Sequence, residues 1–266
     1  MGFATLDALL AAMPGQHRHL YKASLASQVA GGFASLWKAA GNPTAGANPG
    51  STTPTIPTKD TVGAIPLINP AYGHHNYLAK LHLAGGNAGI LILYDRLWHC
   101  SGFSANITDE QYMGATVEIN RPDGIGLDVE IWLEVYTAIG ATVATVTANY
   151  FDYWYGNLAA TTITTASAAA GRMFPFSLAS SSISGGPIRV DSIQLSAATG
   201  AVGDIGITLL RRIAEIPIPA ANQGQSLDVF ALGMPQIFTD ACLALMAQTS
   251  TTSSGIVSGA LEIVSD

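Results

Sequence analysis

The sequence has 266 residues, of which 48% are hydrophobic and only 11% are Asp, Glu, Lys or Arg, and its net charge is −7. Because an ordinary soluble domain carries roughly a quarter charged residues, this shortage favours a surface partly covered by other protein over an unusual solvent. The negative charge and the scattered basic residues disfavour nucleic-acid binding, and no apolar run reaches the roughly 20 residues of a membrane-spanning helix.

A short amphipathic helix is predicted near the N-terminus. Leucines and a methionine recur at helical spacing in residues 5–13, with Thr5 as a suitable N-cap and Pro14 and Gly15 at the end. A helix this short is unstable alone, so we expect it to dock either on its own body or on a partner. The start of the sequence lacks the basic region of a secretory signal, so we expect no instruction to cross a membrane.

A second apolar stretch and a linker follow. Residues 32–40 carry apolar side chains three and four positions apart, which predicts another short helix, and residues 41–57 are rich in Pro, Gly and Thr, which predicts an extended linker or strap. We therefore divide the chain into an N-terminal arm with its linker, residues 1–60, and a body, residues 61–266. The expected anchors of this arm on a partner are Leu6, Leu9, Leu10, Phe33 and Trp37.

The body has the pattern of many short strands. Residues 77–83 and 88–94 predict a hairpin, and residues 128–136 alternate most clearly between apolar and polar side chains. No helix of 10 to 15 residues is predicted between strands, so we expect a mainly β fold, an antiparallel β-sandwich or jelly-roll-like body. Further strands are predicted at residues 116–120, 142–150, 173–178, 188–195, 205–210, 240–248 and 256–264.

One face of the 128–136 strand carries the strongest enzymatic pattern. Asp128, Glu130 and Glu134 share this face with Trp132 and Tyr136. Alternate residues of a strand lie about 7 Å apart, a separation that glycoside hydrolases use for paired carboxylates. The simpler interpretation, which we prefer, is the solvent-facing side of an amphipathic strand. We therefore predict no catalytic residues and a protein that is not an enzyme.

Two charged residues follow the apolar run of residues 88–94. Asp95 and Arg96 are too polar for a buried strand unless they are paired, so the strand is predicted to end or bend there. Cys100 and Cys242 are predicted to be buried thiols, with a single disulfide bridge between them left open.

The histidines do not predict a metal site. His17 and His19 would share one face of a strand, a geometry that can bind a metal, but the spacing is generic and no carboxylate is close in sequence. We interpret them as loop or interface residues, and we predict no bound metal and no cofactor.

Aromatic residues concentrate in residues 150–155, just before a Gly-Asn pair. Such a segment can cap the end of a sandwich, stack against sugars, or form part of a protein interface. Of the two functional interpretations we prefer the interface, for which the candidate residues are Tyr150, Tyr153, Trp154 and Tyr155.

Several segments resemble hypothetical virion proteins of tailed bacteriophages. They are GILILYDRLWH at residues 89–99, ITLLRRIAEIP at residues 207–217 and DACLALM at residues 240–246, and the likeness extends to SLWKAAG at residues 35–41. The resemblance implies a structural component of the particle, either a capsid cement or decoration protein or a protein of the head-to-tail region. It implies no catalytic motif and no named ligand.

The leading hypothesis is a non-enzymatic virion protein that binds the major capsid protein or other virion proteins. We expect a homo-oligomer, with a trimer favoured, located in the virion after assembly in the cytoplasm of a bacterial host. The alternative from another class is a carbohydrate- or receptor-binding module that uses Trp132, Tyr136 and residues 150–155 to stack against sugars.

Overall fold

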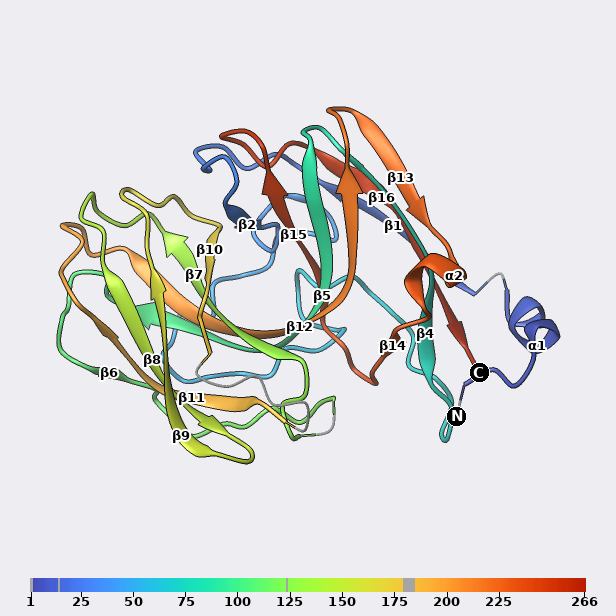
Figure 1. Cartoon of the computed structure of the whole chain (residues 1–266), viewed down its shortest axis with the longest axis horizontal. Helices are drawn as coiled ribbons and strands as arrows, with labels where there is room; N and C mark the ends of the chain where they lie inside the picture. The colour runs from blue at the N-terminus through green and yellow to red at the C-terminus, as the bar shows by residue number, and fades with distance from the viewer. Residues whose placement is uncertain (1, 14, 123, 179–184) are drawn as a thin grey trace.

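The computed structural model describes residues 2–13, 15–122, 124–178 and 185–266. It is mainly β, with antiparallel sheets and a closed barrel, which confirms the predicted fold class. Figure 1 shows two lobes, and two long strands, β5 (Gly89–Phe103) and β12 (Asp204–Ile218), run from one lobe into the other. Both contribute side chains to the three largest buried apolar clusters, so this pair forms the central support of the fold.

The first sheet belongs to the lobe that carries the termini. Its strand order is β13-β4-β16-β1-β3, with β14 paired to β4. Its inner face packs against one half of β5 and β12 through Leu81, Leu83 and Leu261, among others. The strands are β1 (Gln16–Lys22), β3 (Gly41–Asn42), β4 (Asn76–Gly85), β13 (Gln223–Leu227), β14 (Gln236–Ile237) and β16 (Val257–Ser265).

The central barrel closes in the order β10-β2-β15-β5-β12-β7. The remaining strands of the barrel are β2 (Phe33–Ser35), β7 (Val129–Thr137), β10 (Arg172–Pro175) and β15 (Leu243–Thr249). Strand β15 pairs with residues 89–95 of β5, so β15 leaves the edge of β5 beyond Asp95 unpaired. Residues 43–57, the part of the predicted strap that follows β3 and is called the strap below, cover part of this edge. The Thr55 and His99 backbones bind each other there with two hydrogen bonds of 2.9 and 3.0 Å.

The third sheet forms the other lobe and has the order β6-β11-β8-β9. Its inner side chains, such as Val146 and Ala148, pack on Ile131 and Leu133 of β7 in the largest apolar cluster. The apolar side chains of the predicted strand at residues 128–136 therefore face this sheet. The strands are β6 (Gln111–Tyr112), β8 (Thr145–Asp152), β9 (Gly156–Ile163) and β11 (Pro187–Leu195). The strand predicted at residues 116–120 is absent.

Two short helices occur in the described residues, α1 (Leu6–Ala11) and α2 (Val229–Leu232). The predicted N-cap is confirmed, because the Thr5 hydroxyl accepts a hydrogen bond from the Ala8 amide at 3.1 Å. Of the two docking alternatives, the structure shows the helix on its own body, where Leu9 packs against Ala79 and Val264 of the first sheet.

Residues 16–42 are part of the β body, which corrects two expectations. The predicted helix at residues 32–40 is wrong, since Phe33–Ser35 forms strand β2 between β10 and β15. The backbone bonds to these two neighbours outweigh the weak helical spacing of a segment bounded by glycines. Strand β1 pairs with β16 along its whole length, so residues 1–60 do not form an arm as a whole.

Candidate functional site

A cluster of charged and polar side chains fills the interior of the barrel. Arg96 Nη2 donates to Glu134 Oε2 at 2.6 Å, and both side chains are 0% exposed. The same carboxylate oxygen accepts from Tyr136 Oη at 3.0 Å and from Thr208 Oγ1 at 2.8 Å. Arg96 Nε donates to His99 Nδ1 at 2.8 Å. We call these five residues the barrel cluster.

The electrostatics of the barrel cluster fix its charge state. Burial alone would raise the pKa of Glu134, but the charge and hydrogen bond of Arg96 and the bond from Thr208 hold that pKa below its usual value. Burial, and then the charge of Arg96, place the pKa of His99 well below its usual value, so this imidazole is neutral and accepts from the guanidinium. The cluster is therefore a buried ion pair that is hydrogen-bonded to three neighbouring side chains.

The three carboxylates predicted for a glycoside hydrolase do not share an open face. Glu134 is enclosed in the barrel cluster, and Glu130 binds Arg212 Nε at 2.7 Å, whereas Asp128 is exposed beyond the strand end. Trp132 and Tyr136 are buried as well, which excludes them as sugar-stacking platforms. For Trp132, Glu134 and Tyr136 the expected solvent-facing side is wrong, because closure of the barrel turns that part of the face into an interior.

A second buried ion pair explains why β5 continues through its charged residues. Arg121 binds Asp95 with two bonds of 3.0 Å, and the Cys242 amide donates to Asp95 Oδ1 at 2.8 Å. The strand therefore does not end at residues 95–96, because both charges are paired, which is the condition under which the sequence allowed them inside a strand. Cys100 and Cys242 are free and buried, as predicted, and burial raises the pKa of each thiol to about 12.

The predicted arm anchors separate into two groups. Trp37 is 1% exposed inside the barrel and Leu9 is buried under α1, so neither is available to a partner, and Phe33 is half-buried against Trp132. Leu6 and Leu10, each 57% exposed, lie on the outer side of α1. For Trp37 and Leu9 the anchor prediction is corrected, because each is used in the core of its own chain.

The predicted interface aromatics also divide. Tyr150 points into the largest apolar cluster, whereas Tyr153, Trp154 and Tyr155 are exposed in the turn between β8 and β9. The Asp152 carboxylate holds this turn by accepting from the amides of Trp154 and Tyr155 at 2.9 and 3.0 Å. We call residues 153–155 the aromatic turn. Tyr150 is corrected as an interface residue because it lies on the inner face of β8.

The histidines form no metal site in the part of the chain that the structure describes, where no group of three potential ligands occurs. His17 and His19 do share the outer face of β1, with ring centroids 4.6 Å apart. Among the described residues, no helix is long and apolar enough to span a membrane.

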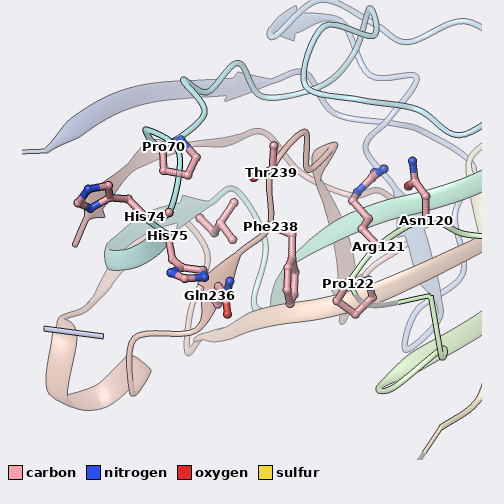
Figure 2. Close-up of a pocket in the computed structure, with 11 residues that line it drawn as sticks. Pro70, His74, His75, Asn120, Arg121, Pro122, Gln236, Phe238 and Thr239 are labelled. Atoms are coloured by element: carbon pink, nitrogen blue, oxygen red, sulfur yellow. The ribbon is translucent and has the colours of Figure 1, made fainter. Parts of the chain in front are cut away.

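A cavity of about 430 Å³ lies between residues 70–75, the end of β14 and the segment around Arg121. Figure 2 shows His74 at one end and Arg121 at the other, with Phe238 between them. No pattern in the sequence indicates this cavity, because its walls come from three distant segments. The Arg121 guanidinium is already bound to Asp95, and His74 and His75 lie within 4 Å of the Asp266 carboxylate.

Comparisons with known proteins identify no family. No protein-family model matches the sequence, and no curated protein is significantly similar to it. The VP2 subviral particle of infectious bursal disease virus is 11% identical, with 94% of this chain and 79% of that chain covered at a TM-score of 0.21. The Gt strain of that virus gives 9% identity, 94% and 80% coverage and a TM-score of 0.22. These TM-scores are far below those of a shared fold, so the resemblance to tailed-phage proteins stays a prediction.

Proposed function

We propose that the chain is a non-enzymatic structural component of a virus particle, and more specifically a cement or decoration protein on the lattice of the major capsid protein. A position in the head-to-tail region is the alternative within this class. The sequence resemblance, the low content of charged residues and the mainly β body support the proposal. The barrel cluster supports a structural role too, since its titratable groups bind one another inside the protein.

The aromatic turn is the observation that carries the proposal. Its three large side chains are between 45% and 60% exposed, and Asp152 fixes the backbone that presents them. Tyr and Trp dominate the binding energy of many protein interfaces, and a rigid turn loses little conformational entropy on binding. The turn therefore has the composition of an interface centre, on a backbone that Asp152 holds by two hydrogen bonds.

A second exposed apolar surface lies on the opposite lobe. Helix α1, whose Leu6 and Leu10 are exposed, packs on the first sheet, whereas the aromatic turn joins β8 and β9 of the third sheet. Figure 1 shows α1 at the opposite end of the molecule from β8 and β9. A protein with contact surfaces on both lobes can bridge two neighbours, which is what a cement protein does on a lattice. The proposal includes a symmetric homo-oligomer, with a trimer favoured, in a particle assembled in the bacterial cytoplasm.

A binding experiment with particles tests this proposal. Replacing the three residues of the aromatic turn by serine should reduce binding to particles that lack the chain by more than about tenfold, because hot-spot residues each contribute above about 1 kcal/mol. Density-gradient sedimentation measures the bound fraction. Tyr72→Ser is the control, since Tyr72 is an exposed aromatic far along the chain from the turn. Binding of the serine variant equal to that of the parent would contradict the proposal.

A groove on the outer face of the third sheet favours a second candidate function, carbohydrate binding. The cavity of about 460 Å³ is lined by Glu110, Tyr112, Asn149, Asn157, Asp191 and Ser192, among others. Glu110 accepts from Tyr112 Oη at 2.6 Å and from Asn149 Nδ2 at 2.8 Å. Carboxylate, amide and hydroxyl groups beside an exposed tyrosine ring match the hydroxyl groups and apolar face of a sugar. These are not the residues expected from the sequence.

A glycan array tests this second candidate. Sugars bound by the parent should be lost with Tyr112→Ala and retained with Tyr72→Ala, which removes an exposed tyrosine outside the groove. An array without any bound glycan would exclude the candidate while leaving the particle-binding proposal intact.

A further inference from the structure

Three side chains meet where the strap crosses the mouth of the barrel. The Lys38 amine contacts Asn48 Oδ1, and the nitrogen of the same carboxamide, Nδ2, donates to Asp204 Oδ2 at 3.4 Å. A nucleophilic amine thus lies against the carbonyl side of an amide, while a carboxylate lies on the side of the nitrogen that would leave. Nothing in the proposed function uses these three residues.

The backbone around the three residues holds them in register. The Gly46 amide donates to the Trp37 carbonyl at 2.8 Å, and Trp37 Nε1 donates to the Ala47 carbonyl at 3.0 Å. These bonds join Trp37, which precedes Lys38, to Gly46 and Ala47, which precede Asn48. A Cβ atom at Gly46 would lie 2.1 Å from the Trp37 ring, so only glycine allows the strap to approach this closely.

The surroundings also orient each reacting group. Trp37 is buried in the barrel beneath the Arg96 guanidinium, 4.8 Å from its ring, so it is a fixed support. Lys38 Nζ lies 3.4 Å from the Tyr136 carbonyl oxygen, a second hydrogen bond that directs the amine. Asp204 Oδ1 accepts from the Gly102 amide at 2.7 Å, which leaves Oδ2 toward Asn48.

We propose that Lys38 and Asn48 join in an intramolecular isopeptide bond, with Asp204 as the catalytic residue that carries the proton. The attack requires the unprotonated amine, so the Lys38 ammonium first gives one proton to solvent. Nζ then attacks Asn48 Cγ, a bond from Nζ to Cγ forms, and the bond from Cγ to Nδ2 breaks. Asp204 takes the proton that Nζ loses and passes it to Nδ2, which leaves as ammonia. The reaction is an amine plus an amide giving a new amide plus ammonia, so it needs no oxidant, metal or cofactor.

Proximity supplies most of what this reaction requires. An amine and an amide do not condense at a useful rate in dilute solution, but groups held in contact by a rigid scaffold react with very high effective concentrations. The Trp37 contacts with the strap provide that scaffold here. The bond would fix the strap across the barrel and restrict the unfolded chain, as a disulfide does, in a protein whose two cysteines are free.

Mass spectrometry of the full chain tests the proposal. The intact mass should be lower than the mass calculated from the sequence by about 17 Da, the mass of one ammonia. Trypsin should fail to cleave after Lys38, because its side chain is acylated, and should release residues 23–59 as one peptide that carries the same deficit. A chain of full calculated mass, cleaved normally after Lys38, would overturn the proposal.

Three variants separate the isopeptide from other causes of ammonia loss. Lys38→Arg keeps a positive hydrogen-bond donor but removes the nucleophile, and it should restore the full mass. Asp204→Asn should leave most molecules unreacted. The control Lys59→Arg changes a lysine whose amine pairs with the exposed carboxylate of Asp60, and it should keep the deficit. An ammonia deficit that persists in Lys38→Arg would instead reveal a succinimide at an asparagine and overturn the proposal.

A gel provides a readout that is independent of mass. A covalently closed loop between residues 38 and 48 survives denaturation. The parent should therefore migrate differently from Lys38→Arg in high-resolution denaturing electrophoresis. The two proteins should migrate alike if no bond forms. The outcome does not depend on whether the chain binds particles, so failure here leaves the proposed function unaffected.

Discussion

Neutralising Glu134 should cost the protein a large part of its stability. The variant Glu134→Gln keeps the shape of the side chain and an oxygen that can accept from Arg96, Tyr136 and Thr208. It removes the negative charge that compensates a fully buried guanidinium and replaces the other carboxylate oxygen by an amide NH2 group. Breaking a buried ion pair in this way costs about 3 to 5 kcal/mol, because the remaining charge is left uncompensated.

The loss can be measured by thermal and urea denaturation. For a chain of this size, about 3 to 5 kcal/mol corresponds to a fall in Tm of about 6 to 20 °C. The matched control is Glu130→Gln, on the same face of the same strand. Glu130 and Arg212 are 34% and 33% exposed, so their pair should contribute less than about 1 kcal/mol.

Two results would refute the reasoning behind this prediction. One is a loss below about 1 kcal/mol for Glu134→Gln, which would mean that water or a neighbour compensates Arg96. The other is an equal loss for Glu130→Gln, which would mean that burial does not decide the effect. The double variant Arg96→Met with Glu134→Gln should recover part of the stability, since it removes the uncompensated charge.

The remaining predictions concern pH, thiols and the strap. The pKa of Glu134 is lower in the folded chain than in the unfolded chain. Its contribution to the free energy of unfolding is therefore present above the unfolded pKa and is lost as the pH falls through the folded pKa. Acid titration of the parent should show this loss of stability, and Glu134→Gln should lack it. Cys100 and Cys242, whose pKa values burial raises to about 12, should react with a thiol reagent only after denaturation; fast labelling of the native protein would contradict their burial. Gly46→Ala should lower Tm and release the strap from Trp37, measurable as faster proteolysis within residues 43–57, and an unchanged digestion pattern would count against the close approach.

The strands that the sequence predicted best are those whose pattern is local. The β7 alternation and the α1 cap were both recognised, because each depends on residues within one turn or one strand. The orientation of β7 was not, since a polar strand face normally meets water. Here that face meets Arg96, 38 positions away along the chain, and only closure of the barrel brings the two together.

The candidate sites were predicted poorly because they too depend on contacts between residues that are far apart in the sequence. The segment of Phe33 was too short to distinguish helix from strand, and its partners β10 and β15 lie more than 130 residues away. The aromatic residues 150–155 were recognised as a cluster, but the exposed members begin only where Asp152 turns the chain. The contact of Lys38 with Asn48 lies within one segment, yet the carboxylate that completes it comes from β12.

The proposed place of the chain in a virus particle is tested most directly by quantifying it in purified particles. Particles isolated on a density gradient from the natural source should contain the chain in a fixed ratio to the major capsid protein, and high-salt washing should remove little of it, since the aromatic turn is uncharged. Recovery of the chain only in the soluble fraction, with particles that are complete without it, would contradict the account.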